Sequence, residues 1–289
     1  MDLTTMQDYL AVVREGTISA AAQSLHVAQP SLSRRMKELE EELGVSLFVR
    51  GNRRITLTEE GMALRKRAEE IVRLVEMTQE EISQLRNHVS GAVRIGAGES
   101  QAFHLLSRNA AALSREHPDL RFHVTSGDTQ DLMDELDHGL IDFAVIFTEA
   151  DPALYRSIPL PASDRFGVLM PKDCDLASRS GVRLEELQGR PLLISRASEP
   201  FFTGTELLAG LNVVGTYNLI YNASLMVEDG LGLALCFDGL VGTGSGSALR
   251  FVPLVPELRV TGRLVWKKYQ VFPPAARLFL DRVRRELGE

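Results

Sequence analysis

The most informative part of the chain spans residues 29–44 and reads QPSLSRRMKELEEELG. Proline at position 30 suits the first turn of a helix, and glycine at position 44 suits the helix end. Between them apolar side chains recur at spacings of four, three and four residues, at Leu32, Met36, Leu39 and Leu43. This period predicts a single helix that buries one apolar stripe.

The order of charges along this helix is unusual. Its first half carries Arg34, Arg35 and Lys37, and its second half carries glutamate at positions 38, 40, 41 and 42. The helix dipole favours the opposite order, by roughly a few tenths of a kcal/mol per charge. A helix that enters the DNA major groove by its N-terminal end needs cations there and carboxylates away from the phosphates. The candidate DNA-binding residues are Gln29, Pro30, Ser31, Ser33, Arg34, Arg35 and Lys37; a solvated charged face is the alternative.

Two shorter helices precede this stretch, and a hairpin follows it. Apolar side chains mark a first helix that ends near position 16, and small side chains between 18 and 25 mark a second that a neighbour can approach closely. Residues 47–49 and 55–57 alternate on either side of a Gly-Asn pair, as in a β-hairpin. Arg50, Arg53 and Arg54 surround its tip, where they can hold phosphates. Residues 1–58 are therefore predicted to form a winged helix-turn-helix DNA-binding domain.

Residues 59–89 are predicted to form one long linker helix, because they contain no proline and no glycine after Gly61. Apolar or small side chains repeat at alternating spacings of four and three, at Leu64, Ala68, Ile71, Val75, Thr78, Ile82 and Leu85. Such a heptad seam is typical of a helix that pairs with another, which predicts a homodimer or homotetramer. The alternative is an amphipathic helix that packs on its own domain.

The composition bounds what else the chain does. The 289 residues carry 32 basic and 39 acidic side chains, a net charge of −7, so a nucleic-acid surface must be local. No secretory pattern is found at the start, and no apolar run reaches the ~18 residues of a membrane span. We therefore expect a cytoplasmic protein without a membrane partner. Cys174 and Cys236 stand far apart without histidine neighbours, which argues against a metal site or a disulfide.

From residue 90 onward, apolar strands alternate with helical patterns, which predicts an α/β fold. Strands are expected at 92–97, 120–126 and 142–147, with helices at 101–117 and 129–138, in a parallel sheet. Apolar segments at 166–170, 191–194, 212–217 and 231–237 supply a second sheet, and residues 264–267 with a helix over 274–287 return to the first. The region 90–289 is thus expected to have two lobes, lobe I over about 90–161 and 265–289 and lobe II over about 162–264.

Several motifs resemble the LysR-type transcriptional regulators, and the match covers residues 2–61 almost without gaps. These are Tyr9-Leu10-Ala11-Val12, Ser19-Ala20-Ala21-Ala22-Gln23-Ser24-Leu25, Gln29-Pro30-Ser31-Leu32-Ser33-Arg34, Leu39-Glu40, Leu43-Gly44, Leu47-Phe48-x-Arg50 and Leu57-Thr58-x-x-Gly61. Ala28 departs from the pattern, since the family often has Ser or Thr there. The resemblance implies a sequence-specific regulator that binds double-stranded DNA as a homo-oligomer, with RNA polymerase as a further partner. It also implies a periplasmic-binding-protein-like effector domain, with a small-molecule effector between its lobes.

Polar turns at the carboxyl ends of the predicted strands are candidate effector contacts, because ligands of such sheets lie beyond these strand ends. A single turn of this kind is more often a helix cap; the resemblance adds that the turns converge on one cleft. The candidate effector residues are Ser100, Gln101, Thr129, Phe147, Ser195, Arg196 and Asn222, with Arg196 as the partner of a carboxylate. Phe201 and Phe202 are candidate walls of this cleft.

The sequence contains no constellation that predicts catalysis. Gly96-x-Gly98 follows a predicted strand, but Gln101 stands where a dinucleotide-binding fingerprint needs a third glycine. We therefore expect no enzyme, no cofactor and no metal, and an effector whose identity the sequence leaves open. The alternatives are a two-lobed solute-binding protein or enzyme with an accessory DNA-binding head, and a purely architectural DNA-binding protein. A thiol-based redox sensor is a weaker alternative, because Lys172 is the one basic neighbour of the cysteines.

Overall fold

The computed structural model describes residues 1–50, 55–84, 90–202 and 210–289. The chain divides into two compact units, Met1–Arg86 and Asn87–Glu289, and each unit has its own hydrophobic core. Arg53 and Arg54, which the sequence assigns to the hairpin tip, lie outside the described residues, as does Leu85 of the predicted seam.

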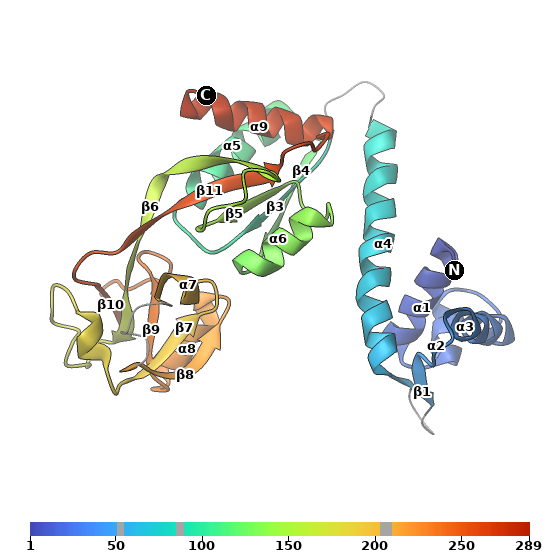
Figure 1. The fold of residues 1–289 in the computed structure, drawn as a ribbon, viewed down its shortest axis with the longest axis horizontal. Helices are drawn as coiled ribbons and strands as arrows, with labels where there is room; N and C mark the ends of the chain where they lie inside the picture. Colours follow the sequence, from blue (N-terminus) through green and yellow to red (C-terminus); the bar gives the residue numbers. More distant parts are fainter. Residues whose placement is uncertain (51–54, 85–89, 203–209) are drawn as a thin grey trace. The chain divides into compact units, whose positions relative to one another are not determined.

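The first unit consists of helices and one small hairpin (Figure 1). Its elements are α1 (Leu3–Glu15), α2 (Ile18–Ser24), α3 (Gln29–Leu43), β1 (Phe48–Arg50), β2 (Ile55–Leu57) and α4 (Glu59–Gln84). The strands pair antiparallel, with Val49 opposite Thr56. This arrangement confirms the predicted winged helix-turn-helix and the long helix that follows it.

The core of the first unit forms where α1, α3 and the start of α4 meet. Tyr9, Leu32 and Met36 are buried in it. The Tyr9 hydroxyl donates a 2.6 Å hydrogen bond to the carbonyl of Gly61, and burial raises the pKa of Tyr9 to about 12. A Cβ atom on Gly61 would lie 2.2 Å from the carbonyl oxygen of Leu47. Glycine at this position therefore lets α4 begin directly against the wing.

The second unit is an α/β structure built on one continuous path of strands (Figure 1). The strands are β3 (Gly91–Ala97), β4 (Leu120–Ser126), β5 (Phe143–Ile146), β6 (Tyr155–Pro171), β7 (Pro191–Ser195), β8 (Asn212–Tyr217), β9 (Leu233–Phe237), β10 (Leu249–Pro253) and β11 (Arg259–Lys267). The helices are α5 (Phe103–Glu116), α6 (Thr129–Asp137), the 3-10 turn η1 (Leu184–Leu187), α7 (Glu199–Phe202), α8 (Ile220–Glu228) and α9 (Pro274–Leu287). The strand order is β4-β3-β5-β11-β6-β9-β7-β8, with β10 beside β6.

Two long antiparallel strands, β6 and β11, run from one lobe into the other (Figure 1). In lobe I, β3 pairs in parallel with β4 and β5, and β11 joins β5. In lobe II, β7 pairs in parallel with β8 and β9, and β9 joins β6. The lobe boundaries expected near residues 161 and 265 thus fall inside these two strands. The lobes are connected by continuous backbone, which limits their relative motion to a bend or twist of the two strands.

Most of β6 is a structural feature that the sequence pattern missed. Apolar character predicted a strand over 166–170, whereas β6 begins at Tyr155. Pro159 and Pro161 interrupt the alternation, and proline is normally confined to sheet edges and bulges because it lacks the N–H donor. Pairing with β11, in which Pro159 lies opposite Arg263, keeps this segment extended.

Each lobe has helices against its sheet. In lobe I, α5 and α9 enclose a core around Phe143 and Phe279, and α6 packs on the other side of the sheet around Ile141. In lobe II, one core surrounds Phe166 and a second, under α8, contains Leu193. The carboxyl ends of β3, β7 and β9 consequently lie where the two lobes face each other, at residues 97, 195 and 237.

Candidate DNA-binding face and ligand cavity

The surface of α3 begins with an exposed, polar first turn. Gln29, Pro30 and Ser31 are exposed, and Ser33 is partly buried. Ala28, at the N-cap, provides no side-chain hydrogen bond to the helix. Because the departure from the family pattern is at this position, the first turn lacks a hydroxyl cap.

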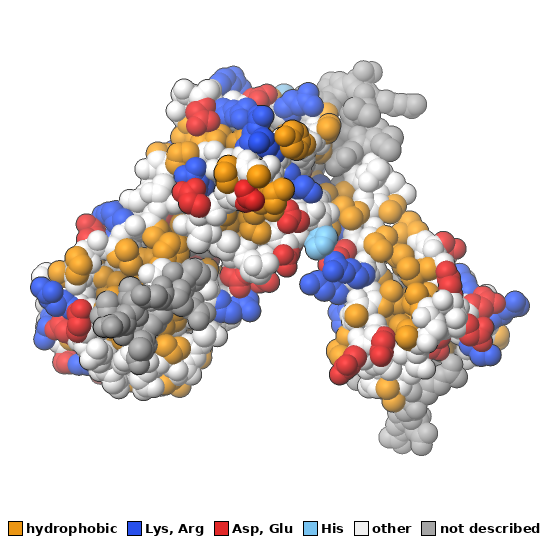
Figure 2. Space-filling model, viewed as in Figure 1, with side chains coloured by type: hydrophobic (Ala, Val, Ile, Leu, Met, Phe, Trp, Pro, Cys, Tyr) orange, Lys and Arg blue, Asp and Glu red, His pale blue; other side chains and the backbone are white. Residues whose placement is uncertain are grey.

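Two cations of α3 point away from the core. The Arg34 side chain is 82% exposed and the Lys37 side chain 70% exposed. Each contacts a glutamate one turn later: Arg34 Nε lies 2.7 Å from Glu38 Oε1, and Lys37 Nζ lies 3.3 Å from Glu41 Oε1. Basic and acidic side chains consequently lie side by side over α3 (Figure 2). Exposed pairs of this kind are weak, so both cations are available to another anion.

Arg35 has a different position from its neighbour. Its Nη1 atom lies 2.8 Å from Oδ2 of Asp8, a buried residue of α1. Burial raises the pKa of Asp8, and the positive charge of Arg35 opposes this shift. Arg35 therefore holds α3 against α1, because a buried carboxylate without this partner would be costly.

The wing is held in place by a glutamate of α3. Glu40 Oε1 accepts hydrogen bonds from the backbone nitrogens of Leu47, at 2.7 Å, and Phe48, at 3.3 Å. The backbone nitrogen of Ile55 donates to the carbonyl of Gly16, at 2.9 Å. These contacts fix the base of the hairpin relative to α3. Arg50 ends β1, while Arg53 and Arg54 lie in the segment that the structure leaves undescribed.

The apolar stripe of α4 is used within the chain along its first turns, which corrects part of the predicted dimer seam. Ala68 is 1% exposed in the core of the first unit, and Leu64 and Val72 pack against the same core. Further along, Ile71 is 37% exposed and Val75 is partly exposed. Ile82 lies in the last described turns of α4. The core of the first unit thus covers only part of the apolar stripe of α4.

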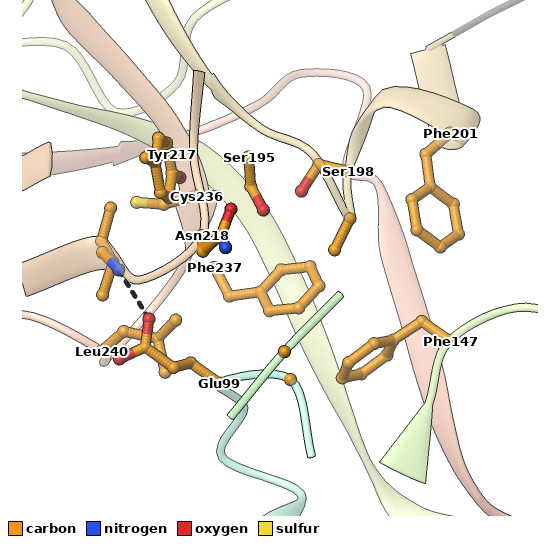
Figure 3. Close-up of a pocket in the computed structure, with 14 residues that line it drawn as sticks. Glu99, Phe147, Ser195, Ser198, Phe201, Tyr217, Asn218, Cys236, Phe237 and Leu240 are labelled. Atoms are coloured by element: carbon orange, nitrogen blue, oxygen red, sulfur yellow. Dashed lines mark hydrogen bonds between the residues drawn. The ribbon is translucent and has the colours of Figure 1, made fainter. Parts of the chain in front are cut away.

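A cavity of about 460 Å³, including the part open to solvent, lies between the two lobes (Figure 3). Its lining residues come from the ends of strands in both lobes. They are Gly98, Glu99, Gly127, Phe147, Ser195, Ala197, Ser198, Phe201, Tyr217, Asn218, Ile220, Cys236, Phe237 and Leu240. About 40 Å³ of this space is open to the centre of a water-sized sphere, so the enclosed part of the cavity is small.

Aromatic rings form one wall of this cavity. The ring centroids of Phe147, from the end of β5, and Phe237, from the end of β9, are 5.1 Å apart. Phe237 also packs on Phe166 at 4.6 Å, and Phe166 contacts Phe201 at 5.7 Å. Opposite these rings lie the hydroxyls of Ser195 and Ser198 (Figure 3). The cavity therefore offers an aromatic wall and a few uncharged hydrogen-bonding groups.

Polar contacts connect the lobes around the cavity. Glu99 of lobe I accepts a 2.6 Å hydrogen bond from the backbone nitrogen of Ile220, the first residue of α8. Gln101 Nε2 donates to the carbonyl of Gly239 at 2.7 Å. Arg196 of lobe II contacts two carboxylates of lobe I, Asp128 at 3.1 Å and Asp131 at 3.3 Å. All of these contacts span the two lobes, so separating the lobes would break them.

Of the seven predicted effector residues, Phe147 and Ser195 line this cavity. Ser100 instead donates a 2.5 Å hydrogen bond to Asp164 of β6, and Gln101 reaches Gly239. Thr129 begins α6, and Asn222 is an exposed residue of α8. The five residues outside the lining are Ser100, Gln101, Thr129, Arg196 and Asn222.

Other lining residues were not among the predicted set. Glu99, Tyr217, Asn218 and Phe237 belong to it. Each lies at or directly after the carboxyl end of a strand, so the rule about strand ends contained the signal. Glu99 is adjacent to Ser100, which the sequence pattern predicted as an effector contact. Of the predicted walls, Phe201 lines the cavity and Phe202 is buried in the core beside it.

The phenol and thiols near the cavity stay protonated at neutral pH. Burial raises the pKa of Cys236 to about 12 and places that of Tyr217 well above its usual range. The Tyr217 hydroxyl donates to the carbonyl of Leu235 at 2.5 Å. Burial also raises the pKa of Cys174. Since the thiolate is the reactive form, neither cysteine is activated for thiol chemistry.

Among the described residues, no group of three or more His, Cys, Asp and Glu side chains could hold a metal ion. Within the same ranges, no helix is both long and apolar enough to cross a membrane.

Comparison with known families agrees with both units. Residues 3–62 match the bacterial regulatory helix-turn-helix proteins of the lysR family, and residues 86–288 match the LysR substrate binding domain. The chain belongs to the LysR family: it is a transcriptional regulator with an N-terminal helix-turn-helix DNA-binding domain and a C-terminal substrate-binding domain.

Individual relatives support this classification. The chain is 26% identical to the HTH-type transcriptional regulator BsdA of Bacillus subtilis, over 97% of this chain and 99% of that protein. Among solved structures, CbnR, a LysR family transcriptional regulator, is similar with a TM-score of 0.76 at 19% identity, over 99% of both chains. CbnR in complex with its target DNA gives a TM-score of 0.73 at 20% identity, over 99% of both chains. At this level of identity the two structures show the same fold.

Proposed function

We propose that the exposed face of α3 binds the major groove of double-stranded DNA through Ser31, Arg34 and Lys37. The observation that carries this proposal is the exposure of both cations on the side of α3 opposite its buried stripe. An arginine that bonds a guanine edge gives sequence choice, and contacts to phosphate give affinity. Glu40 fixes the base of the wing to α3, and we propose that Arg50, Arg53 and Arg54 of the wing add phosphate contacts.

The test compares two arginines in the same local geometry. Arg34 pairs with Glu38 on α3, and Arg65 pairs with Glu69 on α4 at 2.9 Å, again one turn apart. We expect Arg34→Ala to weaken binding of a duplex selected by the wild-type protein about tenfold or more, and to relax its sequence preference. Arg65→Ala is the matched control and should bind like wild type. Equal affinities of the wild type and both variants, measured by fluorescence anisotropy at two salt concentrations, would contradict the proposal.

The described stripe of α4 supports assembly into a homodimer. Its first turns, as far as Val72, pack on the chain's own core, while Ile71 and Val75 keep part of their apolar surface exposed. Hydrophobic side chains gather along α4 in the space-filling view (Figure 2). We propose that Ile71, Val75 and Ile82 form the interhelical seam, with Leu85 continuing it. Further pairing of dimers into a homotetramer is compatible with this arrangement.

The cavity between the lobes is proposed to bind the small-molecule effector. Ligand in the cavity would contact both lobes, and the contacts of Glu99, Gln101 and Arg196 across the lobes would change with it. Coupling to DNA requires that the ligand favours one arrangement of lobes or protomers, typically by about 1–3 kcal/mol.

We further propose that the protein performs no catalysis and needs no cofactor besides its effector. The regulators it resembles act by binding, and the thiols and phenol near the cavity stay protonated. Its proposed place of action is the cytoplasm, where its DNA and RNA polymerase, a further proposed partner, are found.

A further inference from the structure

The described lining of the cavity between the lobes contains a carboxylate and no basic side chain. Among the lining residues that the structure describes, Glu99 is the one side chain that carries a formal charge. The other lining groups are aromatic rings, small aliphatic groups, hydroxyls, an amide and a thiol. Among the described lining residues no cation balances Glu99, so their summed formal charge is negative.

The carboxylate of Glu99 occupies the place where an anion would otherwise be attracted. It accepts the hydrogen bond from the backbone nitrogen of Ile220, where α8 begins, and the N-cap residue Leu219 provides no side-chain bond of its own. The N-terminus of a helix favours negative charge through its N–H groups and its dipole. At α8 this preference is satisfied by the chain's own carboxylate, which comes from the opposite lobe (Figure 3).

A cation adjacent to the lining in sequence, Arg196, is also paired with carboxylates. Arg196 is next to the lining residue Ala197, but its Nη2 atom lies 3.1 Å from Asp128 and 3.3 Å from Asp131. Two carboxylates for one guanidinium leave it little attraction for a third.

We propose that this cavity selects a small aromatic ligand that carries no negative charge. The inference rests on the proposed function of the cavity as the effector site. The rings of Phe147, Phe201 and Phe237 supply the surface for stacking or edge contacts with an aromatic ring. Ser195 and Asn218 supply hydrogen bonds to an uncharged polar substituent. A carboxylate on the ligand would face Glu99, and one of the two would lose favourable interactions.

The experiment uses three probes with the same ring: benzoate, benzamide and benzylamine, which are negative, neutral and positive at neutral pH. Binding to the full-length protein is measured by ligand-observed NMR, with benzamide as the reference. We expect benzoate to bind about tenfold or more weakly than benzamide. Benzylamine is expected to bind at least as well as benzamide. Benzoate binding that equals or exceeds benzamide binding would overturn the proposal, as would failure of all three probes to bind.

A charge-neutral variant tests the role assigned to Glu99. Glu99→Gln keeps an oxygen that can accept from Ile220, so the lobe contact is preserved while the charge is removed. The variant should bring benzoate within about threefold of benzamide and weaken benzylamine. Glu228→Gln, at the other end of α8 and exposed, removes the same charge and should leave the ranking of wild type unchanged. An unchanged ranking in Glu99→Gln would contradict the proposal.

The wild-type ranking alone decides the ligand class if the Glu99 variant fails to fold. Binding of a selected DNA duplex by the same preparations is measured separately. If the wild-type protein does not bind DNA, the proposed function is refuted. If the protein binds DNA but prefers benzoate to benzamide, only the proposed ligand class is refuted.

Discussion

Arg34 and Arg35 are adjacent in the sequence and have different physical surroundings. The Arg34 side chain is 82% exposed, whereas that of Arg35 is 30% exposed and lies against Asp8. One residue along a helix is a rotation of about 100°, which is enough to move a side chain from the outer face to the contact with a neighbouring helix. The first arginine is therefore available to a partner molecule, and the second stabilises the domain.

This difference predicts opposite effects of two alanine substitutions. Arg35→Ala leaves the Asp8 carboxylate buried without its cation and should lower the free energy of unfolding by about 1–3 kcal/mol. Arg34→Ala should leave the midpoint of thermal unfolding unchanged within error while it weakens DNA binding. Circular dichroism melts of both variants provide the comparison. Equal melting temperatures for the two variants would show that the Asp8 contact contributes nothing.

Asp164 predicts a pH dependence of stability. This residue is 3% exposed, and burial raises its pKa above the usual 3.8, although hydrogen bonds from Ser100 and from the backbones of Gln101 and Ala102 oppose the shift. The folded protein therefore holds this proton more tightly than the unfolded chain. The contribution of Asp164 to stability is consequently fully present below the unfolded-state pKa of 3.8 and declines as the pH rises through the raised pKa of the folded state.

The variant Asp164→Asn lacks this ionisation. The melting temperature of the wild type minus that of Asp164→Asn should therefore decrease between pH 4 and pH 6. Calorimetry at several pH values in this range measures the difference. A difference that grows as the pH rises would mean that the hydrogen bonds to the carboxylate outweigh its burial.

At the scale of elements, α4 performs two tasks with one apolar stripe. The turns that carry Leu64, Ala68 and Val72 complete the core of the first unit. On the same helix Ile71, next to Val72, and Val75, three residues after it, keep part of their surface exposed. A heptad seam repeats about every 3.5 residues along a helix. A helix that is longer than the domain it packs on can offer its remaining turns of this seam to a second helix.

Substitutions on opposite sides of α4 test this division. Ile71→Asp places a charge in the proposed seam and should raise the dissociation constant of the dimer about tenfold or more. Met62 is 56% exposed and lies nine residues earlier, roughly 180° around the helix from Ile71. Met62→Asp should leave the dimer intact. Sedimentation velocity over a range of concentrations distinguishes the two, and equal dissociation constants for both variants would place the seam elsewhere.

The periodic features of these elements were predictable from the sequence. The spacing of Leu32, Met36 and Leu39 predicted their burial in α3, and the apolar segment at 231–237 predicted the strand β9. The partner of Arg35 was not predictable, since Asp8 lies on another helix and nothing in the local pattern distinguishes Arg35 from Arg34. Ala68 was placed on the correct stripe, but the sequence alone does not show which part of that stripe the chain's own core covers.

The cavity was predictable in its location and less so in its chemistry. The rule that ligands lie beyond strand ends indicated the turns after β3 and β7, and Phe147 and Ser195 do line the cavity. The pairing of Arg196 with Asp128, and of Glu99 with the start of α8, depends on how the lobes face each other. The sequence predicted that Arg196 would pair with a carboxylate of the ligand. In the structure Arg196 is already paired, which leaves Glu99 as the charged group of the described lining.

For the whole molecule, the first unit and the two-lobed second unit have separate cores. Continuous strands connect the lobes, and polar contacts of Glu99, Gln101 and Arg196 span them. A ligand between the lobes can therefore affect their relative orientation without unfolding either one. The central claim of this account is that the exposed face of α3, presented twice by a dimer, recognises a DNA sequence.

Selection from a pool of random duplexes by the full-length protein tests this claim most directly. We expect sequencing of the bound fraction to give two half-sites related by two-fold symmetry, about one helical turn or a multiple of it apart. Selection with Arg34→Ala should lose the preference at one position of each half-site, while Arg65→Ala should reproduce the wild-type sequence. A bound pool without any enriched sequence, or identical enrichment by the wild type and Arg34→Ala, would contradict the account.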